Sequence, residues 1–315
     1  MKNDLPIPAN EKERLAALKS YDILDTASEE RINNLTELAS EICGVPIGLV
    51  SLIDEDRQWF KAKIGIEVNE TPRAISFCQF AIMENELMEV QNALNDDRFK
   101  NNALVSDDPS IRFYAGQPLI DDDGFALGTL CMIDNQPKQL TDFQKKSLRI
   151  LAKEIVIEIQ DRKKRKERGI YKKFFENSLD LLCIANTDGF FKKLNPSFQK
   201  TLGWSEAEML GKPFTDFIHP EDLEKTLKEI DKLSQGHKTI GFENRFLKKS
   251  GGFVWLDWNS HPDTETGELF AVAHDITPLK DLVTKLKANN HTLDQFAYTV
   301  SHDLKAPLRA ISGFT

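Results

Sequence analysis

The sequence predicts an α+β protein in which two sets of β-strands, each accompanied by helices, are joined and followed by long helices. Strand-like runs of apolar residues occur between residues 46 and 133 and again between residues 181 and 276. Glycine-containing turns separate consecutive runs in both sets, as in antiparallel hairpins. A helical stretch without Gly or Pro spans residues 145–168, and an apolar heptad pattern follows the second set.

The composition is that of a globular chain with two domains. The 315 residues are 40% hydrophobic and 29% charged. A net charge of −9 argues against a nucleic-acid binder. The longest apolar run, residues 45–53, is too short to span a bilayer, and no apolar signal segment begins the chain. We therefore expect a soluble, cytoplasmic protein without a membrane span.

The four cysteines are widely scattered and form no metal-ligand motif. They are Cys43, Cys78, Cys131 and Cys183. This pattern predicts buried free thiols in a reducing compartment, and no metal site.

The first domain opens with two amphipathic helices and continues with strands. The helices are predicted at 11–20 and 28–42, the second with an imperfect capping box, because Ser28 is followed by Arg31 instead of Glu. A hairpin turn is predicted at 121–124, where Gly124 tolerates the positive φ of a tight turn. A helix from residue 141 to about 166 closes the unit. The predicted strands are 46–53, 57–64, 87–92, 112–120 and 125–133.

Four segments of this region resemble GAF domains. They are Val-Ser-Leu-Ile-Asp-Glu-Asp-Arg-Gln-Trp-Phe (50–60), Thr-Pro-Arg-Ala-Ile-Ser-Phe-Cys (71–78), Arg-Phe-Tyr-Ala-Gly-Gln-Pro-Leu (112–119) and Leu-Gly-Thr-Leu-Cys-Met-Ile-Asp (127–134). The resemblance implies a GAF domain over residues 10–165, with a six-stranded antiparallel sheet, helices behind it and a ligand pocket in front.

The ligand of this pocket is left open. Cys78 is followed by Gln79, whereas the tetrapyrrole-binding relatives carry a Cys-His pair, and the cyclic-nucleotide pattern is not visible. A structural, dimerising GAF domain without a tight ligand is favoured over a ligand-binding one. The candidate pocket residues are Arg57, Trp59, Arg73, Cys78 and Arg112.

The connecting helix carries an apolar stripe and then a basic run. Leu148, Leu151, Ile155 and Ile159 recur on one face, which predicts a parallel dimer seam. The basic run at 162–166 is interpreted as a solvated helix face in preference to a nucleic-acid or membrane patch.

A second strand set follows from residue 171, after a helix end near residue 178. Strands are predicted at 181–186, 190–194, 238–248, 253–261 and 268–276. Helices are predicted at 196–202 and 205–210, with Gly203 and Gly211 as stops, and from 223 to about 235. Turns at 187–189, 249–252 and 266–267 separate the strands.

This region resembles PAS domains. The segments that carry the resemblance are Asn-Pro-Ser-Phe (195–198), Leu-Gly-Trp-Ser (202–205), His-Pro-Glu-Asp (219–222) and Asp-Ile-Thr (275–277). The resemblance implies a five-stranded antiparallel sheet within residues 166–280. It also implies that Asp275, Ile276 and Thr277 relay signals from the sheet to the next helix. His219 is interpreted as structural, and no flavin-binding motif is present, so a relaying PAS domain with a small or empty core is favoured.

The segment after residue 277 carries a heptad seam. Leu279, Leu282, Leu286, Leu293, Phe296 and Val300 recur at spacings of three and four when Asn289 fills the gap. A single polar residue in such a seam fixes register and strand number. The pattern predicts a coiled-coil linker within 281–315 that joins two subunits into a homodimer. We expect signals to change the register or rotation of this seam.

The last predicted helix presents a histidine opposite its apolar face. Val300, Leu304 and Leu308 are spaced by four residues, and His302 is turned roughly 200° away from them at about 100° per residue. An exposed imidazole beside Asp303 suits nucleophilic chemistry at neutral pH. Pro307 removes one backbone donor and is expected to bend the helix.

The string Ser-His-Asp-Leu-Lys-Ala-Pro-Leu (301–308) resembles the phosphoacceptor box (HisKA domain) of sensor histidine kinases. The resemblance implies that His302 is phosphorylated, that Asp303 is its acid/base neighbour, and that phosphate passes to an aspartate of a response-regulator receiver domain. Ala306 stands where many such kinases carry Thr or Asn, which puts phosphatase activity in doubt.

The ATP-binding domain of these kinases is not found in the sequence. No P-loop or other nucleotide cradle is visible. We therefore expect no cofactor in this chain, and ATP with Mg²⁺ in a catalytic domain that lies elsewhere, so that the chain is a fragment or a truncated product. The alternative is a non-catalytic sensory and dimerisation module that docks a partner kinase or regulator.

Overall fold

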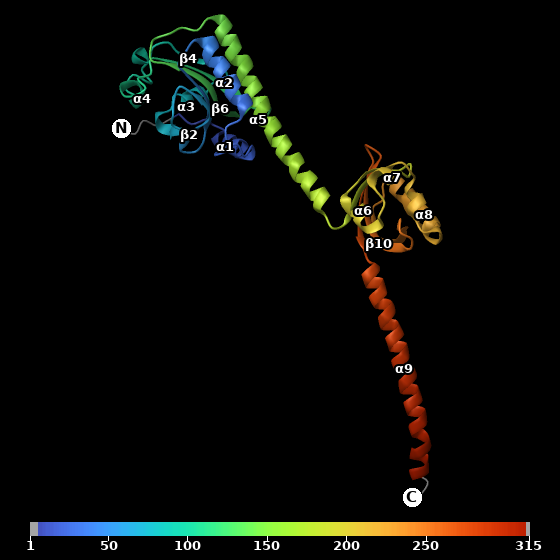
Figure 1. Ribbon diagram of the computed structural model, residues 1–315. Coiled ribbons are helices and arrows are strands. Elements are labelled where there is room, and N and C mark those ends of the chain that lie inside the picture. The colour runs from blue at the N-terminus through green and yellow to red at the C-terminus, as the bar shows by residue number, and fades with distance from the viewer. Residues whose placement is uncertain (1–5, 313–315) are drawn as a thin grey trace. The chain divides into compact units, whose positions relative to one another are not determined.

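The structure, a computed structural model, describes the backbone of residues 6–312 and the side chains of residues 6–295. The chain divides into two compact units, with the boundary between Arg168 and Gly169. Both units combine antiparallel sheets with helices, as predicted (Figure 1). Among the described residues, no helix is both long and apolar enough to cross a membrane.

The first unit is a six-stranded antiparallel sheet with helices on both faces, in the order β3-β2-β1-β6-β5-β4. One face is covered by α1, α2 and the first half of α5, and the other by the short α3 and α4. The strands are β1 (Ile47–Ile53), β2 (Arg57–Ile64), β3 (Glu70–Pro72), β4 (Met88–Val90), β5 (Phe113–Ile120) and β6 (Ala126–Asp134). The helices are α1 (Glu11–Ser20), α2 (Glu30–Cys43), α3 (Cys78–Ala81), α4 (Ala103–Ser106) and α5 (Asp142–Asn177), with 3-10 turns η1 (Arg73–Ile75) and η2 (Ala93–Asn95).

Two local predictions for this unit are wrong. The second helix begins at Glu30 and not at Ser28, and its N-cap residue Glu29 makes no side-chain cap, so there is no capping box. The sequence also failed to predict β3, because Glu70–Pro72 is short and shows no apolar alternation. This strand pairs with β2 at the edge of the sheet, a position that tolerates proline.

The connecting helix α5 differs from its prediction in length and in the role of its apolar stripe. It is a single helix of 36 residues that continues past residue 166 and through Gly169. Leu148, Leu151 and Ile155 are buried in the core of the first unit, as is Ile159. The predicted dimer seam on these residues is therefore wrong, because the unit's own sheet and α2 already cover that face.

The second unit is the predicted five-stranded antiparallel sheet, and its strands lie in the order β8-β7-β11-β10-β9. Helix α7 begins with a capping box between Ser205 and Glu208. The strands are β7 (Leu181–Asn186), β8 (Phe191–Leu194), β9 (Thr239–Leu247), β10 (Phe253–Asp263) and β11 (Glu268–Asp275). The helices are α6 (Pro196–Leu202), α7 (Glu206–Leu210) and α8 (Leu223–Ser234), with 3-10 turns η3 (Phe214–Phe217) and η4 (Pro220–Asp222).

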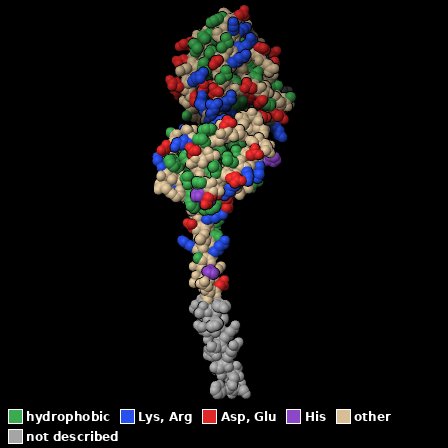
Figure 2. Space-filling model, turned by 90° about the vertical axis from the view of Figure 1, so that its right-hand side faces the viewer, with side chains coloured by type: hydrophobic (Ala, Val, Ile, Leu, Met, Phe, Trp, Pro, Cys, Tyr) green, Lys and Arg blue, Asp and Glu red, His purple; other side chains and the backbone are tan. Residues whose placement is uncertain are grey.

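Helix α9 (Thr277–Ser312) follows β11 directly. Leu279, Leu282, Leu286 and Leu293 each expose more than half of their side-chain surface. Figure 2 shows this described stretch of α9 with no other segment over it. The side chains of Phe296, Val300, His302, Asp303 and Pro307 lie outside the described residues, so the exposure of His302 and the bend at Pro307 stay predictions.

Candidate functional site

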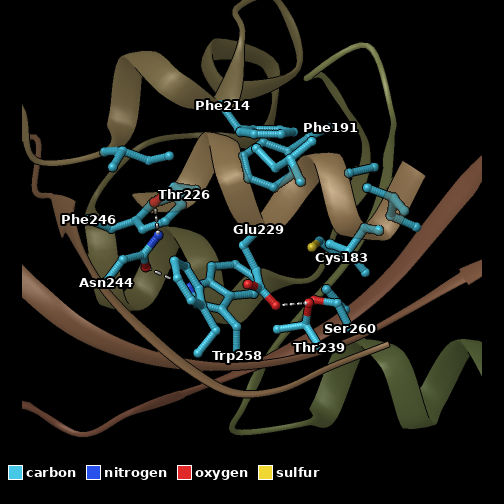
Figure 3. Close-up of a pocket in the computed structure, with 17 residues that line it drawn as sticks. Cys183, Phe191, Phe214, Thr226, Glu229, Thr239, Asn244, Phe246, Trp258 and Ser260 are labelled. Atoms are coloured by element: carbon cyan, nitrogen blue, oxygen red, sulfur yellow. Dashed lines mark hydrogen bonds between the residues drawn. The ribbon is translucent and has the colours of Figure 1, made fainter. Parts of the chain in front are cut away.

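An apolar cavity of about 80 Å³ lies inside the second unit, between the concave face of the sheet and the helical segment that crosses it. Strands β7 to β11, η3 and α8 contribute its walls (Figure 3). Most of the lining is aromatic or aliphatic, and the polar exceptions are Thr226, Glu229, Thr239, Asn244 and Ser260. A small, largely apolar molecule with one or two polar groups matches such a lining.

Asn244 is the most deeply buried of these polar residues, with 1% of its surface exposed. Its Oδ1 accepts a hydrogen bond from the indole Nε1 of Trp258 at 2.8 Å, and its Nδ2 donates to Oγ1 of Thr226 at 3.2 Å. The two bonds tie β9 to β10 and to α8. Both the oxygen and the nitrogen of the amide have hydrogen-bond partners within the protein. These two bonds fix the positions of Trp258 and Thr226 in the wall of the cavity.

Glu229 brings a carboxylate to the wall of the cavity. The hydroxyl of Thr239 donates to its Oε1 at 2.8 Å, and Lys232 pairs with its Oε2 at 2.9 Å. The hydrogen bond from Lys232 is the main reason that the pKa of Glu229 lies below its ordinary value. The ionised carboxylate would favour a ligand that carries a hydrogen-bond donor or a positive charge.

Cys183 lines the same cavity but is not a nucleophile at neutral pH. Burial raises the pKa of its thiol to about 12, which leaves it protonated. The lining therefore contains groups for binding and no activated nucleophile.

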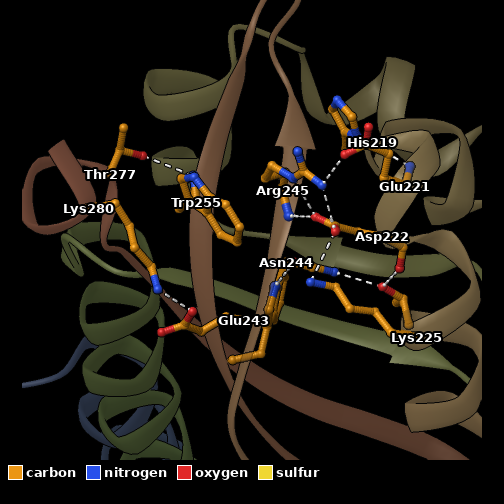
Figure 4. Close-up of polar contacts among 12 residues, drawn as sticks. His219, Glu221, Asp222, Lys225, Glu243, Asn244, Arg245, Trp255, Thr277 and Lys280 are labelled. Carbon is orange, nitrogen blue, oxygen red and sulfur yellow. Dashed lines mark hydrogen bonds and ion pairs between the residues drawn. The ribbon is translucent and has the colours of Figure 1, made fainter. Parts of the chain in front are cut away.

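The strands that wall the cavity also hold the first turn of α9 (Figure 4). The backbone N–H of Trp255 on β10 donates to Oγ1 of Thr277 at 2.9 Å, and the N–H of Ile276 donates to the carbonyl of Trp255 at 3.0 Å. Oδ1 of Asp275 accepts the N–H of Thr277 at 2.9 Å. The predicted relay triplet thus lies where the sheet joins α9.

A side-chain contact adds to this junction. Lys280 of α9 forms an ion pair with Glu243 of β9, and its Nζ lies 5.2 Å from the ring centre of Trp255. Glu243 is the neighbour of Asn244 in the strand, so their side chains point to opposite faces of the sheet. One face of β9 therefore lines the cavity while the other holds α9.

A partly buried ion pair at Arg245, the residue after Asn244, ties β9 to η4. Arg245 donates from Nε and Nη2 to the two carboxylate oxygens of Asp222 at 2.9 Å each, and its backbone N–H adds a third bond at 2.8 Å. The Arg245 guanidinium holds the pKa of Asp222 well below its ordinary value. His219 caps η4 through Nδ1, which accepts the N–H of Glu221 at 3.3 Å, and this agrees with its structural interpretation.

The five candidate residues of the first unit do not form one pocket. Arg57 and Arg73 meet at the turn after β1, where Arg57 pairs with the Asp54 side chain at 3.2 Å and Arg73 binds its carbonyl at 2.9 Å. Trp59 and Cys78 belong to cores on opposite faces of the sheet. Arg112 donates to the backbone carbonyls of residues 105, 110 and 111.

The cavity in the second unit was not predicted. The sequence did contain one indication of it. Phe242, Asn244 and Phe246 are every second residue of β9, so they share one face of the strand, and the amide of Asn244 lies between two aromatic side chains. A buried amide between aromatic residues needs partners, and these come from α8 and β10, distant in sequence.

Comparison with known families identifies both units. Residues 28–159 match the family model described as GAF domain, and residues 191–272 match the model described as PAS fold. The chain therefore contains a GAF domain followed by a PAS domain. This combination supports a sensory signalling role.

Two curated proteins are similar to parts of the chain. A cyclic di-GMP phosphodiesterase of Pseudomonas aeruginosa is 40% identical over 133 residues, which are 42% of this chain and 23% of that protein. The Escherichia coli protein named "Probable diguanylate cyclase DgcE" is 29% identical over 115 residues, 34% of this chain and 10% of that protein. The chain thus matches less than a quarter of the length of either relative.

A solved structure is also similar to part of the chain. It is a domain of a sensory box sensor histidine kinase/response regulator from Geobacter sulfurreducens, 17% identical, covering 35% of this chain and 94% of that chain with a TM-score of 0.32. A TM-score this low supports no functional comparison.

Proposed function

We propose that this chain is the sensory and phosphoacceptor part of a sensor histidine kinase of a two-component phosphorelay. The single observation that carries the proposal is the string at 301–308, which lies on the same helix, α9, that the PAS sheet holds at Thr277. In this proposal His302 receives a phosphoryl group and Asp303 assists as acid/base neighbour. The phosphoryl group then passes to an aspartate of a response-regulator receiver domain. ATP and Mg²⁺ belong to a catalytic domain of the same system.

The PAS cavity is the proposed sensory element. A ligand that moves β9 or β10 acts directly on the residues that hold α9, because Glu243 and Trp255 belong to these strands. A small change at the cavity is thereby converted into a rotation or shift of the helix. The helix carries this change toward residue 302.

Homodimerisation through the long helices is a further part of the proposal. The leucines of α9 between 279 and 293 form an exposed row at heptad spacing. On α5, Phe143, Ile150 and Ile157 are exposed at intervals of seven residues. This row replaces the buried stripe as the seam on α5, since its side chains face away from the GAF core.

A second candidate function follows from the curated relatives. One is named a cyclic di-GMP phosphodiesterase and the other a probable diguanylate cyclase, so the second candidate is that the GAF and PAS domains of this chain serve an enzyme of one of these classes. The similarity covers at most 42% of this chain and does not decide the output. The string at 301–308 favours phosphotransfer.

Phosphate mapping on the native protein tests the proposal. The protein is purified without acid from cells that carry the gene, and phosphate is located by mass spectrometry. We expect acid-labile phosphate on His302 that is lost in His302→Gln and kept in His291→Gln, a control on the same helix. Unphosphorylated His302 under conditions in which the cell's other histidine kinases are phosphorylated would overturn the proposal, and cyclic di-GMP turnover by the native protein would favour the second candidate.

A further inference from the structure

Two of the four cysteines lie together in the GAF domain. Cys78 is the first residue of α3, and Cys131 lies on β6. Their sulfur atoms are 3.6 Å apart, and both residues are at most 1% exposed. The remaining cysteines, Cys43 and Cys183, are also buried but belong to other cores. Cys78 and Cys131 therefore differ from Cys43 and Cys183 in having a second sulfur atom close by, and not in burial.

Hydroxyl groups surround the sulfur of Cys78. The Tyr114 hydroxyl donates to Sγ of Cys78 at 3.2 Å. Ser51 and Thr129 are fully buried and face each other across β1 and β6, and their hydroxyls have no hydrogen-bond partner among the described residues. Buried hydroxyls normally find partners, so their lack of one here indicates a group to which they are poised to donate. The adjacent sulfur, as a thiolate, is such a group.

Gly116 leaves space for the side chain of Tyr114. A Cβ atom at this position would lie 2.2 Å from the Tyr114 hydroxyl oxygen. The glycine on β5 therefore lets the phenol lie flat over the strand and reach Cys78.

The two sulfurs have unequal acidities. Burial raises the pKa of the Cys78 thiol, but the contact with Cys131 and the nearby hydroxyl groups outweigh it, and the net direction is downward. The pKa of Cys131 is raised well above its ordinary value, because it donates to Cys78 and is itself buried. Cys78 is thus the more acidic of the two thiols, and Cys131 holds a proton beside it.

We propose that Cys78 and Cys131 form a redox-sensitive site that a hydroperoxide converts into an intramolecular disulfide. The Cys78 thiolate attacks the hydroperoxide, ROOH, and breaks its O–O bond, forming a sulfenic acid and releasing ROH once the leaving oxygen takes a proton. The Cys131 sulfur then attacks the sulfenic sulfur, and the disulfide forms as water leaves. The two thiols supply two electrons, which reduce one hydroperoxide.

The fold allows the small movement that this requires. The sulfur atoms must approach from 3.6 Å to the covalent distance of about 2.05 Å. Helix α3 has four residues and follows the 3-10 turn η1, so it is a small element that can shift against the sheet. Its neighbour Phe77 stacks on Phe99 with ring centres 3.9 Å apart. Oxidation would therefore change packing on this face of the GAF domain.

The test is a titration of the full chain with hydrogen peroxide, followed by alkylation and peptide mapping. We expect a Cys78–Cys131 disulfide to form about tenfold faster than thiols are lost at Cys43 or Cys183, because these lone thiols stay protonated. The control variants Cys43→Ser and Cys183→Ser keep the disulfide. In Cys131→Ser, a sulfenic acid at Cys78 is expected to react with dimedone.

Two results would overturn the proposal. The first is that Cys78 and Cys131 both remain thiols at peroxide concentrations that oxidise Cys43 or Cys183. The second is that the disulfide forms only in denaturant. If Cys131→Ser does not fold by circular dichroism, the measurement on the unmodified chain decides alone.

Discussion

The backbone N–H of Trp255 donates to the hydroxyl of Thr277 at 2.9 Å, so a residue of the PAS sheet is bonded to the first residue of the last helix. The same threonine donates its own N–H to Asp275, the last residue of β11. The junction between sheet and helix thus depends on one residue, whose hydroxyl accepts a bond from β10 and whose backbone N–H donates to the end of β11.

Replacing Thr277 tests this junction. Thr277→Ala should lower the protection of the Trp255 amide against hydrogen exchange by about fivefold to tenfold, because a hydrogen bond of about 1 kcal/mol is lost. Thr277→Ser keeps the hydroxyl and should restore the protection. Equal protection in all three proteins would show that the hydroxyl does not hold the junction.

The ion pair between Asp222 and Arg245 should make the PAS domain sensitive to acid. Asp222→Asn is expected to lower the free energy of unfolding by about 2 kcal/mol at neutral pH, since hydrogen bonds to a buried charged group are lost. Urea unfolding followed by tryptophan fluorescence measures the change, because Trp204, Trp255 and Trp258 all belong to this domain.

The sign of the pH dependence follows from the lowered pKa of Asp222. The unfolded carboxyl has a pKa of about 3.9, so the stabilisation is fully present above about pH 5 and is lost as pH falls toward the lower pKa of the folded state. The difference between the two proteins should stay constant above pH 5 and shrink below it. A difference that grows in acid would contradict this assignment.

Asn244 should matter more than Asn259, a partly exposed asparagine on β10. Asn244→Leu leaves the indole N–H of Trp258 without an acceptor in a buried site, and we expect a loss of about 1–3 kcal/mol in unfolding free energy. Asn259 accepts a hydrogen bond from the Gly241 N–H near the surface, so Asn259→Ala should change stability by less than about 0.5 kcal/mol. Similar losses in both variants would mean that Asn244 does not organise the cavity.

The exposed row on α5 should control self-association. Ile157→Glu introduces a charge into the proposed seam and should raise the dimer dissociation constant at least about tenfold, as measured by sedimentation equilibrium. Ile240→Glu, at an exposed position on the edge strand β9, is the matched control. A dimer that is unaffected by Ile157→Glu, or weakened equally by both changes, would remove α5 from the interface.

Much of the secondary structure could be predicted from the sequence because the turns are chemically explicit. The strands at Arg57–Ile64 and Leu181–Asn186 and the helix Pro196–Leu202 begin and end where they were predicted. Gly203 adopts a positive φ of 83° after α6, as a helix stop with glycine requires. In contrast, α5 was predicted to end near residue 166, because local patterns could not show that the helix continues through Gly169.

The sequence by itself determined the two domain families, the order of their elements and the string at 301–308, since these depend on local patterns and residue identity. Only the tertiary structure decided that the stripe at Leu148 and Leu151 faces the GAF core, leaving Ile150 and Ile157 exposed. It also decided that Cys78 lies beside Cys131, and that Asn244 meets Trp258 in a cavity. Amphipathic periodicity shows that a face will be covered but not what covers it, and contacts between distant residues depend on how the strands pair.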